Sequence, residues 1–232
     1  MRARPHQPGM FFDTLFDNTD LFVDAFRTTV SLAVVTGVLC LIGGTVLATL
    51  RVSPVPVLRA AGTVYVNIFR NTPLTLIFVF CFFGLPKIGI TGLSPFQRAV
   101  IALTTYTSAF ICEVLRSGIN TVAAGQAEAA RAVGMTFGQT LRLVVLPQAY
   151  RSAVPPLMST LIAMVKNTTI AAGFSVAEAG RIRAVLAEPD PTTGISYPQL
   201  DVLLWVAVCF VIILLPLSLV QQRLEKRWKV TR

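Results

Sequence analysis

Residues 28–50 read TTVSLAVVTGVLCLIGGTVLATL and contain no charged side chain. Arg27 and Arg51 bound this stretch of 23 residues. A transmembrane α-helix needs about 20 consecutive apolar residues, so the stretch is long enough to cross a bilayer. Residues 202–222, VLLWVAVCFVIILLPLSLVQQ, form a second uncharged stretch of 21 residues. Two such stretches in one chain predict a membrane protein with several spans.

The composition supports the same fold class. Hydrophobic residues make up 54% of the 232 residues and charged residues 13%, whereas a soluble domain carries about 25% charged residues. So few charges would not cover the surface of a soluble protein of this size. The net charge is +9, but the cations lie between the apolar stretches, a pattern that membrane topology produces. We therefore expect an all-α polytopic membrane protein with no nucleic-acid partner.

Three further apolar stretches are interrupted by a few charges, and we interpret each as a span. The predicted spans cover about residues 26–50, 56–85, 97–115, 152–175 and 199–221. They are expected to pack as one domain, 1–232, because together they bury the polar positions within them. Pro73 lies inside the second span, where proline removes a backbone donor and clashes with the carbonyl of Phe69. We expect that span to be kinked or broken.

The distribution of lysine and arginine predicts the orientation in the membrane. If the C-terminus lies in the cytoplasm, five spans place the N-terminus outside. Eleven lysines and arginines then lie in inner segments and seven in outer ones, as the positive-inside rule favours. The chain is expected to be a multi-pass protein of a bacterial plasma membrane, with its basic C-terminal tail touching anionic lipid head groups.

The sequence offers little for catalysis. A phosphate-binding loop requires G-x-x-x-x-G-K-[ST], and none of the four lysines follows a glycine. The single histidine, His6, and four scattered cysteines lack the spacing of a metal site. We predict no catalytic residue, no cofactor and no metal. The chain is expected to be a non-enzymatic subunit, with any ATP hydrolysis carried out by a separate partner.

The longest internal loop, residues 116–151, contains a predicted short helix. Residues 125–134 read GQAEAARAVG, in which Ala, Glu, Gln and Arg favour a helix and Gly134 is typical of a left-handed C-terminal cap. Glu128 and Arg131 are three residues apart and could pair along one face. The small alanines keep the helix thin, which suits insertion into a groove of another protein. An ordinary solvated loop helix is equally compatible with this composition.

The same loop resembles the E-A-A signature of ABC-importer permease subunits. Glu128-Ala129-Ala130 is followed after three residues by Gly134, then after nine residues by Val144 and after one more by Leu146-Pro147. The family prefers isoleucine at the position of Val144. In that family the loop forms a coupling helix that docks in a cleft of the ATPase subunit. The resemblance implies this role for Glu128, Ala129, Ala130, Gly134, Leu146 and Pro147.

Other motifs resemble the polar amino-acid branch of this family, which transports histidine, glutamine and glutamate. They are RNTPL at 70–74, EVLRSGI at 113–119, LPQA at 146–149 and KNTTI at 166–170. The combination looks closest to the actinobacterial glutamate permeases, although many relatives have Lys-Asp-Thr-Ser where this chain has KNTT. The resemblance covers about residues 28–219 and implies a type I ABC importer permease fold. It also implies three kinds of partner: a dimer of ATPase subunits, a second permease subunit, identical or homologous, and an extracellular amino-acid-binding protein.

Arg70 and Lys166 lie deep within predicted spans, where charges are costly and rarely face lipid. Both could hold a substrate carboxylate. Alternatively, Arg70 bonds carbonyls freed by Pro73, and Lys166 pairs with Glu113 or with a partner subunit. Glu113 could equally form an interfacial ion pair with an arginine one turn away. The candidate pathway residues are Arg70, Asn71, Thr72, Lys166, Asn167, Thr168 and Thr169.

These observations predict the permease subunit of an ATP-driven importer for a polar amino acid, with glutamate the substrate that the resemblance favours. The chain would form half of a translocation pore. One alternative is an ion-coupled carrier or channel that works without an ATPase, although carriers usually have paired repeats with broken helices and none is visible here. Another is a membrane enzyme or assembly factor, which would need a catalytic cluster near the end of a span.

Overall fold

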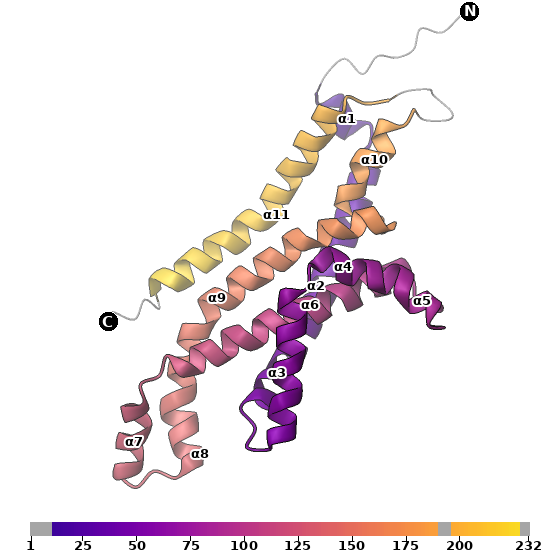
Figure 1. The fold of residues 1–232 in the computed structure, drawn as a ribbon. Helices are drawn as coiled ribbons and strands as arrows, with labels where there is room; N and C mark the ends of the chain where they lie inside the picture. Colours follow the sequence, from indigo (N-terminus) through magenta and orange to yellow (C-terminus); the bar gives the residue numbers. More distant parts are fainter. Residues whose placement is uncertain (1–10, 190–195, 228–232) are drawn as a thin grey trace, which may run out of the picture.

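The computed structural model describes residues 11–189 and 196–227 (Figure 1). This part of the chain is helical and contains no strand. Its α-helices are α1 (Asp13–Phe16), α2 (Thr19–Arg51), α3 (Pro56–Asn71), α4 (Leu74–Val79), α5 (Leu85–Lys87), α6 (Pro95–Asn120), α7 (Ala124–Ala132), α8 (Phe137–Gln139), α9 (Leu146–Asn167), α10 (Ile182–Ala187) and α11 (Gln199–Arg227). Two π-helical segments, η1 (Phe80–Gly84) and η2 (Thr140–Val145), and two 3₁₀ segments, η3 (Thr168–Phe174) and η4 (Ala179–Arg181), connect them.

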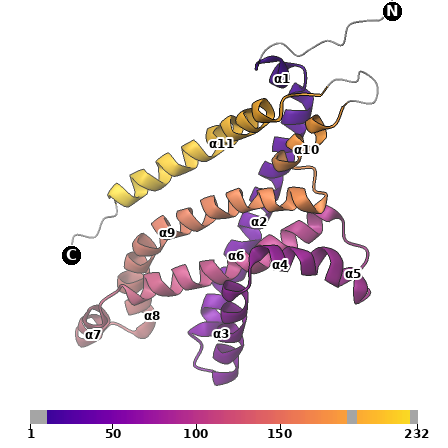
Figure 2. The ribbon, with the colours of Figure 1, turned by 45° about the horizontal axis from the view of Figure 1, so that its top comes forward.

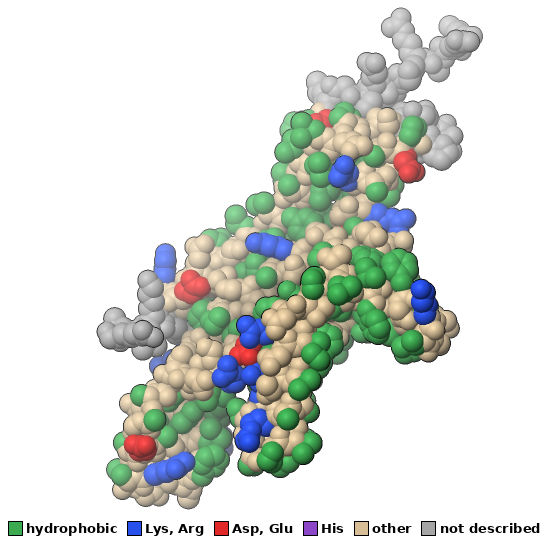
Figure 3. Space-filling model, viewed as in Figure 1, with side chains coloured by type: hydrophobic (Ala, Val, Ile, Leu, Met, Phe, Trp, Pro, Cys, Tyr) green, Lys and Arg blue, Asp and Glu red, His purple; other side chains and the backbone are tan. Residues whose placement is uncertain are grey.

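Four helical segments are long and apolar enough to cross a membrane, and a bent pair of helices makes a fifth if it is counted as one span. The four are Thr19–Arg51, Pro95–Asn120, Phe137–Phe174 and Gln199–Arg227. On the face seen in Figure 3, charged side chains are few and widely spaced. The predicted all-α, multi-span fold is therefore confirmed, while the predicted orientation stays a prediction.

The bent pair is α3 and α4 with the segments that follow α4, and its two arms differ in direction by 104°. Helix α3 ends at Asn71, and Thr72 has an extended backbone (ψ 130°) before Pro73, as expected for a residue that precedes proline. The predicted break at Pro73 is confirmed. Figure 1 shows α4 and α5 turning aside from α3. The rings of Phe78 and Phe82 pack against Phe174 at 5.3 and 5.1 Å and so fix the second arm to η3.

Helix α2 extends the predicted span 26–50 toward the N-terminus by about two turns. Its buried residues recur every three or four positions, which places them on one face. They are Phe22, Ala25, Thr29, Leu32, Thr36, Cys40, Gly44 and Ala48. The opposite face is apolar and exposed, as a helix at the boundary with lipid or another subunit requires.

Helix α6 packs between α2 and α9, and glycines allow the close approach. A Cβ at Gly44 of α2 would lie 2.4 Å from Cγ2 of Ile111 on α6. A Cβ at Gly118 of α6 would lie 2.8 Å from Cβ of Ala153 on α9. Small residues at such crossings are typical of helix packing in membranes. Ser94 and Gln97 form a capping box that starts α6.

Helix α11 lies at the edge of the bundle, next to α9 (Figures 1 and 2). Of its 29 residues only Val202 is buried. Trp205 Nε1 donates a hydrogen bond to the carbonyl of Phe11 at 2.7 Å, and Gln221 Nε2 donates to Ser159 Oγ at 2.8 Å. The rest of this apolar helix is exposed and requires lipid or another protein to cover it.

Candidate functional site

The loop 116–151 is mostly helical, and α7 is its most exposed part. Helix α7 covers residues Ala124–Ala132, so it begins before and ends close to the predicted segment. Figure 1 shows α7 and α8 at one end of the molecule, away from α1 and α10. Ala130 packs inward with 7% of its surface exposed, whereas Glu128 and Ala129 are exposed. The exposed side of α7 is free to meet another protein.

The end of α7 has a complete Schellman motif. The Met135 N–H donates to the Ala130 carbonyl at 3.1 Å and the Gly134 N–H donates to the Arg131 carbonyl at 2.9 Å. Gly134 has φ +89°, the left-handed conformation that favours glycine. This confirms the predicted cap. The ion pair between Glu128 and Arg131 does not form among the described residues; Arg131 instead lies over the ring of Phe137 at 6.0 Å.

Helix α7 is connected mechanically to the fourth span. It packs against η2, and η2 continues directly into α9. Residues 137–174 therefore form one long helical rod, which starts beside α7. Leu146 and Pro147 begin α9 and are both exposed. A displacement of α7 would thus be transmitted along α9.

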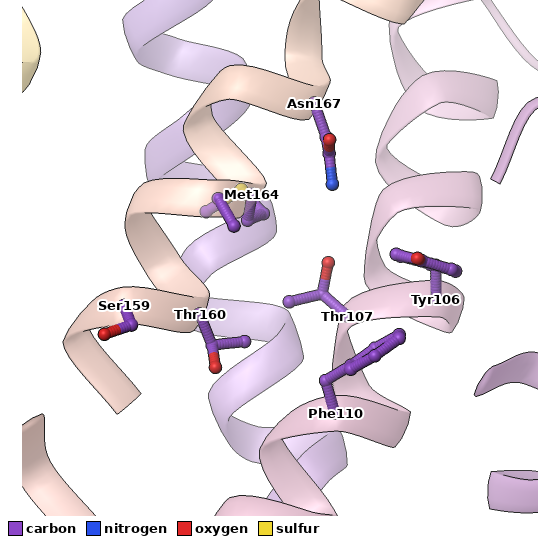
Figure 4. Close-up of a pocket in the computed structure, with 8 residues that line it drawn as sticks. Tyr106, Thr107, Phe110, Ser159, Thr160, Met164 and Asn167 are labelled. Atoms are coloured by element: carbon purple, nitrogen blue, oxygen red, sulfur yellow. The ribbon is translucent and has the colours of Figure 1, made fainter. Parts of the chain in front are cut away.

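A cavity of about 260 Å³ lies between α6 and α9. Its lining is Tyr106, Thr107 and Phe110 from α6 and Ser159, Thr160, Ala163, Met164 and Asn167 from α9. Figure 4 shows Asn167, Thr107 and Thr160 around the space between the two helices. We call this cavity the α6/α9 pocket. It combines hydroxyl and amide groups with two aromatic rings and contains no charged side chain, so it suits a small polar molecule.

One turn along α6 from Phe110, four charged side chains form a cluster, which we call the Glu113 cluster. It consists of Glu113, Arg51 at the end of α2, Arg70 at the end of α3 and Arg116. Glu113 Oε1 accepts a hydrogen bond from Arg51, and Oε2 accepts two from Arg116 at 2.8 and 3.2 Å. Arg70 Nη1 lies 3.3 Å from Oε1. The predicted pair of Glu113 with Arg116 is confirmed, and two further arginines join it.

The predicted pathway residues lie in two separate places. Asn71 and Thr72 donate to the carbonyls of Asn67 and Ile68 within α3. Lys166 is exposed and is not among the groups that pair with Glu113. Thr168 and Thr169 donate to the carbonyls of Val165 and Lys166.

Of the candidates, only Asn167 lines the α6/α9 pocket. Arg70 lies beside it, with Cζ 5.8 Å from the ring centroid of Phe110. Sequence reasoning missed the other lining residues. The signal was present, because Thr160 and Asn167 are seven residues apart and Thr107 and Phe110 three apart, spacings that place each pair on one helix face.

A further buried acid was also missed. Glu178 lies beyond the end of the fourth span, before η4, and its side chain is fully buried. Its Oε1 accepts a hydrogen bond from the Gly180 N–H at 2.8 Å, and Oε2 lies 3.4 Å from the Thr29 hydroxyl. Burial raises the pKa of Glu178 to about 7, although these hydrogen bonds act in the opposite direction. The group therefore changes its charge near neutral pH.

Several apolar spans, a polar pocket between two of them and an exposed helix coupled to one of them define the membrane-embedded subunit of a transporter. Residues 40–230 match the family described as the binding-protein-dependent transport system inner membrane component. The chain belongs to this family. It is therefore a multi-pass permease subunit of the bacterial plasma membrane rather than an enzyme, and family membership implies an ATPase and a substrate-binding protein as partners.

Individual relatives agree. The chain is 43% identical to a glutamate transport system permease protein, GluC, of Corynebacterium glutamicum, over 90% of this chain and 94% of that protein. It is 36% identical to a probable glutamine ABC transporter permease protein, GlnM, of Bacillus subtilis, over 92% of this chain and 95% of that protein. Among solved structures, an amino acid ABC transporter crystallised with histidines matches with a TM-score of 0.84 and 25% identity, over 98% of this chain and all of that chain.

Proposed function

We propose that this chain forms half of a pore through which an ATP-driven importer moves glutamate across the plasma membrane. The observation that carries the proposal is the α6/α9 pocket, a site lined with hydroxyl and amide groups within an otherwise apolar bundle. The identity of 43% with the glutamate permease protein of Corynebacterium glutamicum supports the choice of substrate.

Three kinds of partner follow from this proposal. Two ATPase subunits would bind at the α7 end, which would face the cytoplasm, and an extracellular amino-acid-binding protein would deliver substrate at the α1 end. A second permease subunit, identical or homologous, would supply the other half of the pore. The exposed apolar face of α11 supports contact with that subunit or with membrane lipid.

The pathway would run past the α6/α9 pocket. Asn167 lines the pocket and Arg70 lies against the outer side of the Phe110 ring, so we place both on the route. Asn71 and Thr72 on one side, and Lys166, Thr168 and Thr169 on the other, belong to the segments that would frame it. Their hydroxyl and amide groups that bond neighbouring carbonyls keep those segments in shape.

The coupling helix of the importer would be α7. Glu128 and Ala129 are exposed, Ala130 fixes the helix to its neighbours and Gly134 ends it in a defined place. Leu146 and Pro147 begin the helix that lines the pocket. Closure of the ATPase dimer would pull α7, and α9 would carry the motion to the pocket, so that access to the pocket changes sides.

The coupling role is tested with the complex in proteoliposomes. Glu128→Arg is expected to lower ATP-driven uptake by at least tenfold, because it reverses a charge on the docking face, while leaving the amount of folded permease unchanged. Glu225→Arg, the same change at an exposed position of α11, is the control and should keep uptake within twofold. Full uptake by the Glu128 variant, or failure of a cysteine at position 129 to crosslink to the ATPase in every nucleotide state, would show that α7 is not the coupling helix.

The substrate is tested by competition. Uptake of labelled glutamate is expected to fall when unlabelled glutamate or aspartate is in excess. Inhibition by arginine without inhibition by aspartate would contradict glutamate as the substrate and leave the permease assignment standing.

A further inference from the structure

The inference concerns Arg70 and rests on the proposed function. Arg70 ends α3, directly before the break at Pro73. Its guanidinium faces two different groups: Glu113 Oε1 at 3.3 Å and the ring of Phe110 at 5.8 Å. Phe110 is part of the wall of the α6/α9 pocket. Arg70 therefore lies at the boundary between the Glu113 cluster and the pocket.

The hydrogen bonds of Glu113 leave Arg70 with free donors. Both oxygens of Glu113 already accept hydrogen bonds, from Arg51 and from Arg116. Across residues 11–189 and 196–227, Arg70 donates no hydrogen bond, although a guanidinium has five N–H groups. Its side chain is 44% exposed, against 13% for Arg51. Arg70 is thus the loosely held member of the cluster.

The charge balance points the same way. One carboxylate faces three guanidinium groups, so the cluster carries an excess of two positive charges. An anion would lower the free energy of this arrangement, because uncompensated charges are costly within a membrane. The pocket next to it contains no charged side chain of its own. A ligand with one negative end and other polar groups would satisfy both regions at once.

We propose that Arg70 binds the α-carboxylate of an amino acid that occupies the α6/α9 pocket. The planar guanidinium would form a bidentate pair with the carboxylate. The α-ammonium group would then lie near the faces of Phe110 and Tyr106, where a cation is favoured. The substrate side chain would extend along α9 toward Asn167, past Thr160 and Met164. In this arrangement Arg70 recognises the part that all α-amino acids share, and the α9 residues recognise the side chain.

Two isomeric ligands distinguish the α-carboxylate from the side-chain carboxylate. Glutamine keeps a free α-carboxylate and has an amide on its side chain, whereas isoglutamine has the amide at the α position and a free side-chain carboxylate. Binding of labelled glutamate is measured on the nucleotide-free complex in lipid nanodiscs, without the binding protein, with each isomer as competitor. Glutamine is expected to displace glutamate at least tenfold better than isoglutamine.

Variants assign the preference to one side chain. Arg70→Gln is expected to weaken glutamate binding at least tenfold and to abolish the preference between the two isomers. Arg70→Lys keeps the charge without the bidentate geometry and should retain part of the preference. Arg59→Gln, the same change at an exposed position of the same helix, is the control and should leave binding and preference unchanged.

Several results would overturn the inference. Equal or better competition by isoglutamine on the unmodified complex would show that no group reads the α-carboxylate. An unchanged preference in Arg70→Gln, or its loss in Lys166→Gln instead, would assign the reading to another residue. A complex that binds glutamate without any isomer preference contradicts only this inference, whereas a complex that binds no amino acid contradicts the proposed function as well.

Discussion

Glu113 connects three helices through one carboxylate. The arginines that it contacts come from the end of α2, the end of α3 and its own helix α6. None of these residues is close to the others in sequence except Arg116. A partly buried carboxylate with several charge-assisted hydrogen bonds is held more firmly than an exposed ion pair. The cluster therefore fixes where α3 ends relative to the pocket.

Gly134 gives a prediction at the same scale. With φ +89°, an alanine there would adopt a left-handed backbone that costs about 1–2 kcal/mol. Gly134→Ala is expected to loosen the end of α7 and to lower ATP-driven uptake, measured in proteoliposomes, more than it lowers the thermal stability of the whole chain. Gly125→Ala lies in the same helix with open space around it and should leave uptake intact or favour the helix slightly. Equal uptake by the two variants would contradict this account.

Glu178 predicts a dependence of stability on pH. Its pKa rises from an ordinary value of 4.5 to about 7 in the folded chain, so the folded state holds the proton more tightly than the unfolded state does. The stabilisation is fully present below about pH 4.5 and is lost as the pH rises through 7, by roughly 3 kcal/mol at most. Melting temperatures of the purified protein between pH 5 and 8 should fall with pH at this site.

Glu178→Gln supplies the control for that measurement, because an amide does not titrate in this range. The variant should lose part of the decline in melting temperature between pH 5 and 8. A decline identical to that of the unmodified protein would mean that other groups cause it.

At the scale of helices, the α2–α6 contact depends on the absence of a side chain. A Cβ at Gly44 would lie 2.4 Å from Ile111 Cγ2 and 3.1 Å from the carbonyl oxygen of Ser108. Gly44→Ala is expected to destabilise the protein by about 1–3 kcal/mol, because both helices would have to separate. Gly37→Ala is the matched control, since its nearest neighbour, Met164 Cε, is at an ordinary 3.5 Å. Thermal unfolding in detergent checks both, and equal melting temperatures would exclude close packing at Gly44.

The break between α3 and α4 is the other feature that single elements decide. Pro73 stops the helix, and the following arm turns by 104° and packs its phenylalanines on η3. The break also places Arg70 at a helix end rather than in the middle of a straight span. The guanidinium can therefore reach α6, which a continuous helix would not ensure.

At the scale of the whole molecule, the exposed apolar surface exceeds what one chain can bury. Helix α11 and the outer face of α2 remain uncovered within the described ranges. We predict that the purified importer contains two permease subunits, either two copies of this chain or this chain with a homologue, together with two ATPase subunits. Native mass spectrometry of the complex checks this stoichiometry, and a stable, transport-active complex with a single permease subunit would contradict it.

Much of the fold follows from the sequence. Charge-free stretches such as 28–50 and 202–222 require helices, because a backbone in lipid must satisfy its own hydrogen bonds. Pro73 determines the break, and Gly134 determines the end of α7, because both act on the local backbone. The family also follows from local spacing, since the motif around Glu128 and Leu146 lies in one continuous segment of the chain.

Only the tertiary structure decided which side chains meet. Arg70 joins Glu113 and Phe110 across two helices, Asn167 joins Thr107, and Glu178 is buried against Thr29, although about 150 positions separate that last pair. Helix periodicity gives the face that a residue occupies, but not the rotation and depth at which one helix packs on another. Those depend on the packing of the whole bundle, including contacts such as Gly44 with Ile111, and so the pocket and the Glu113 cluster became visible only in three dimensions.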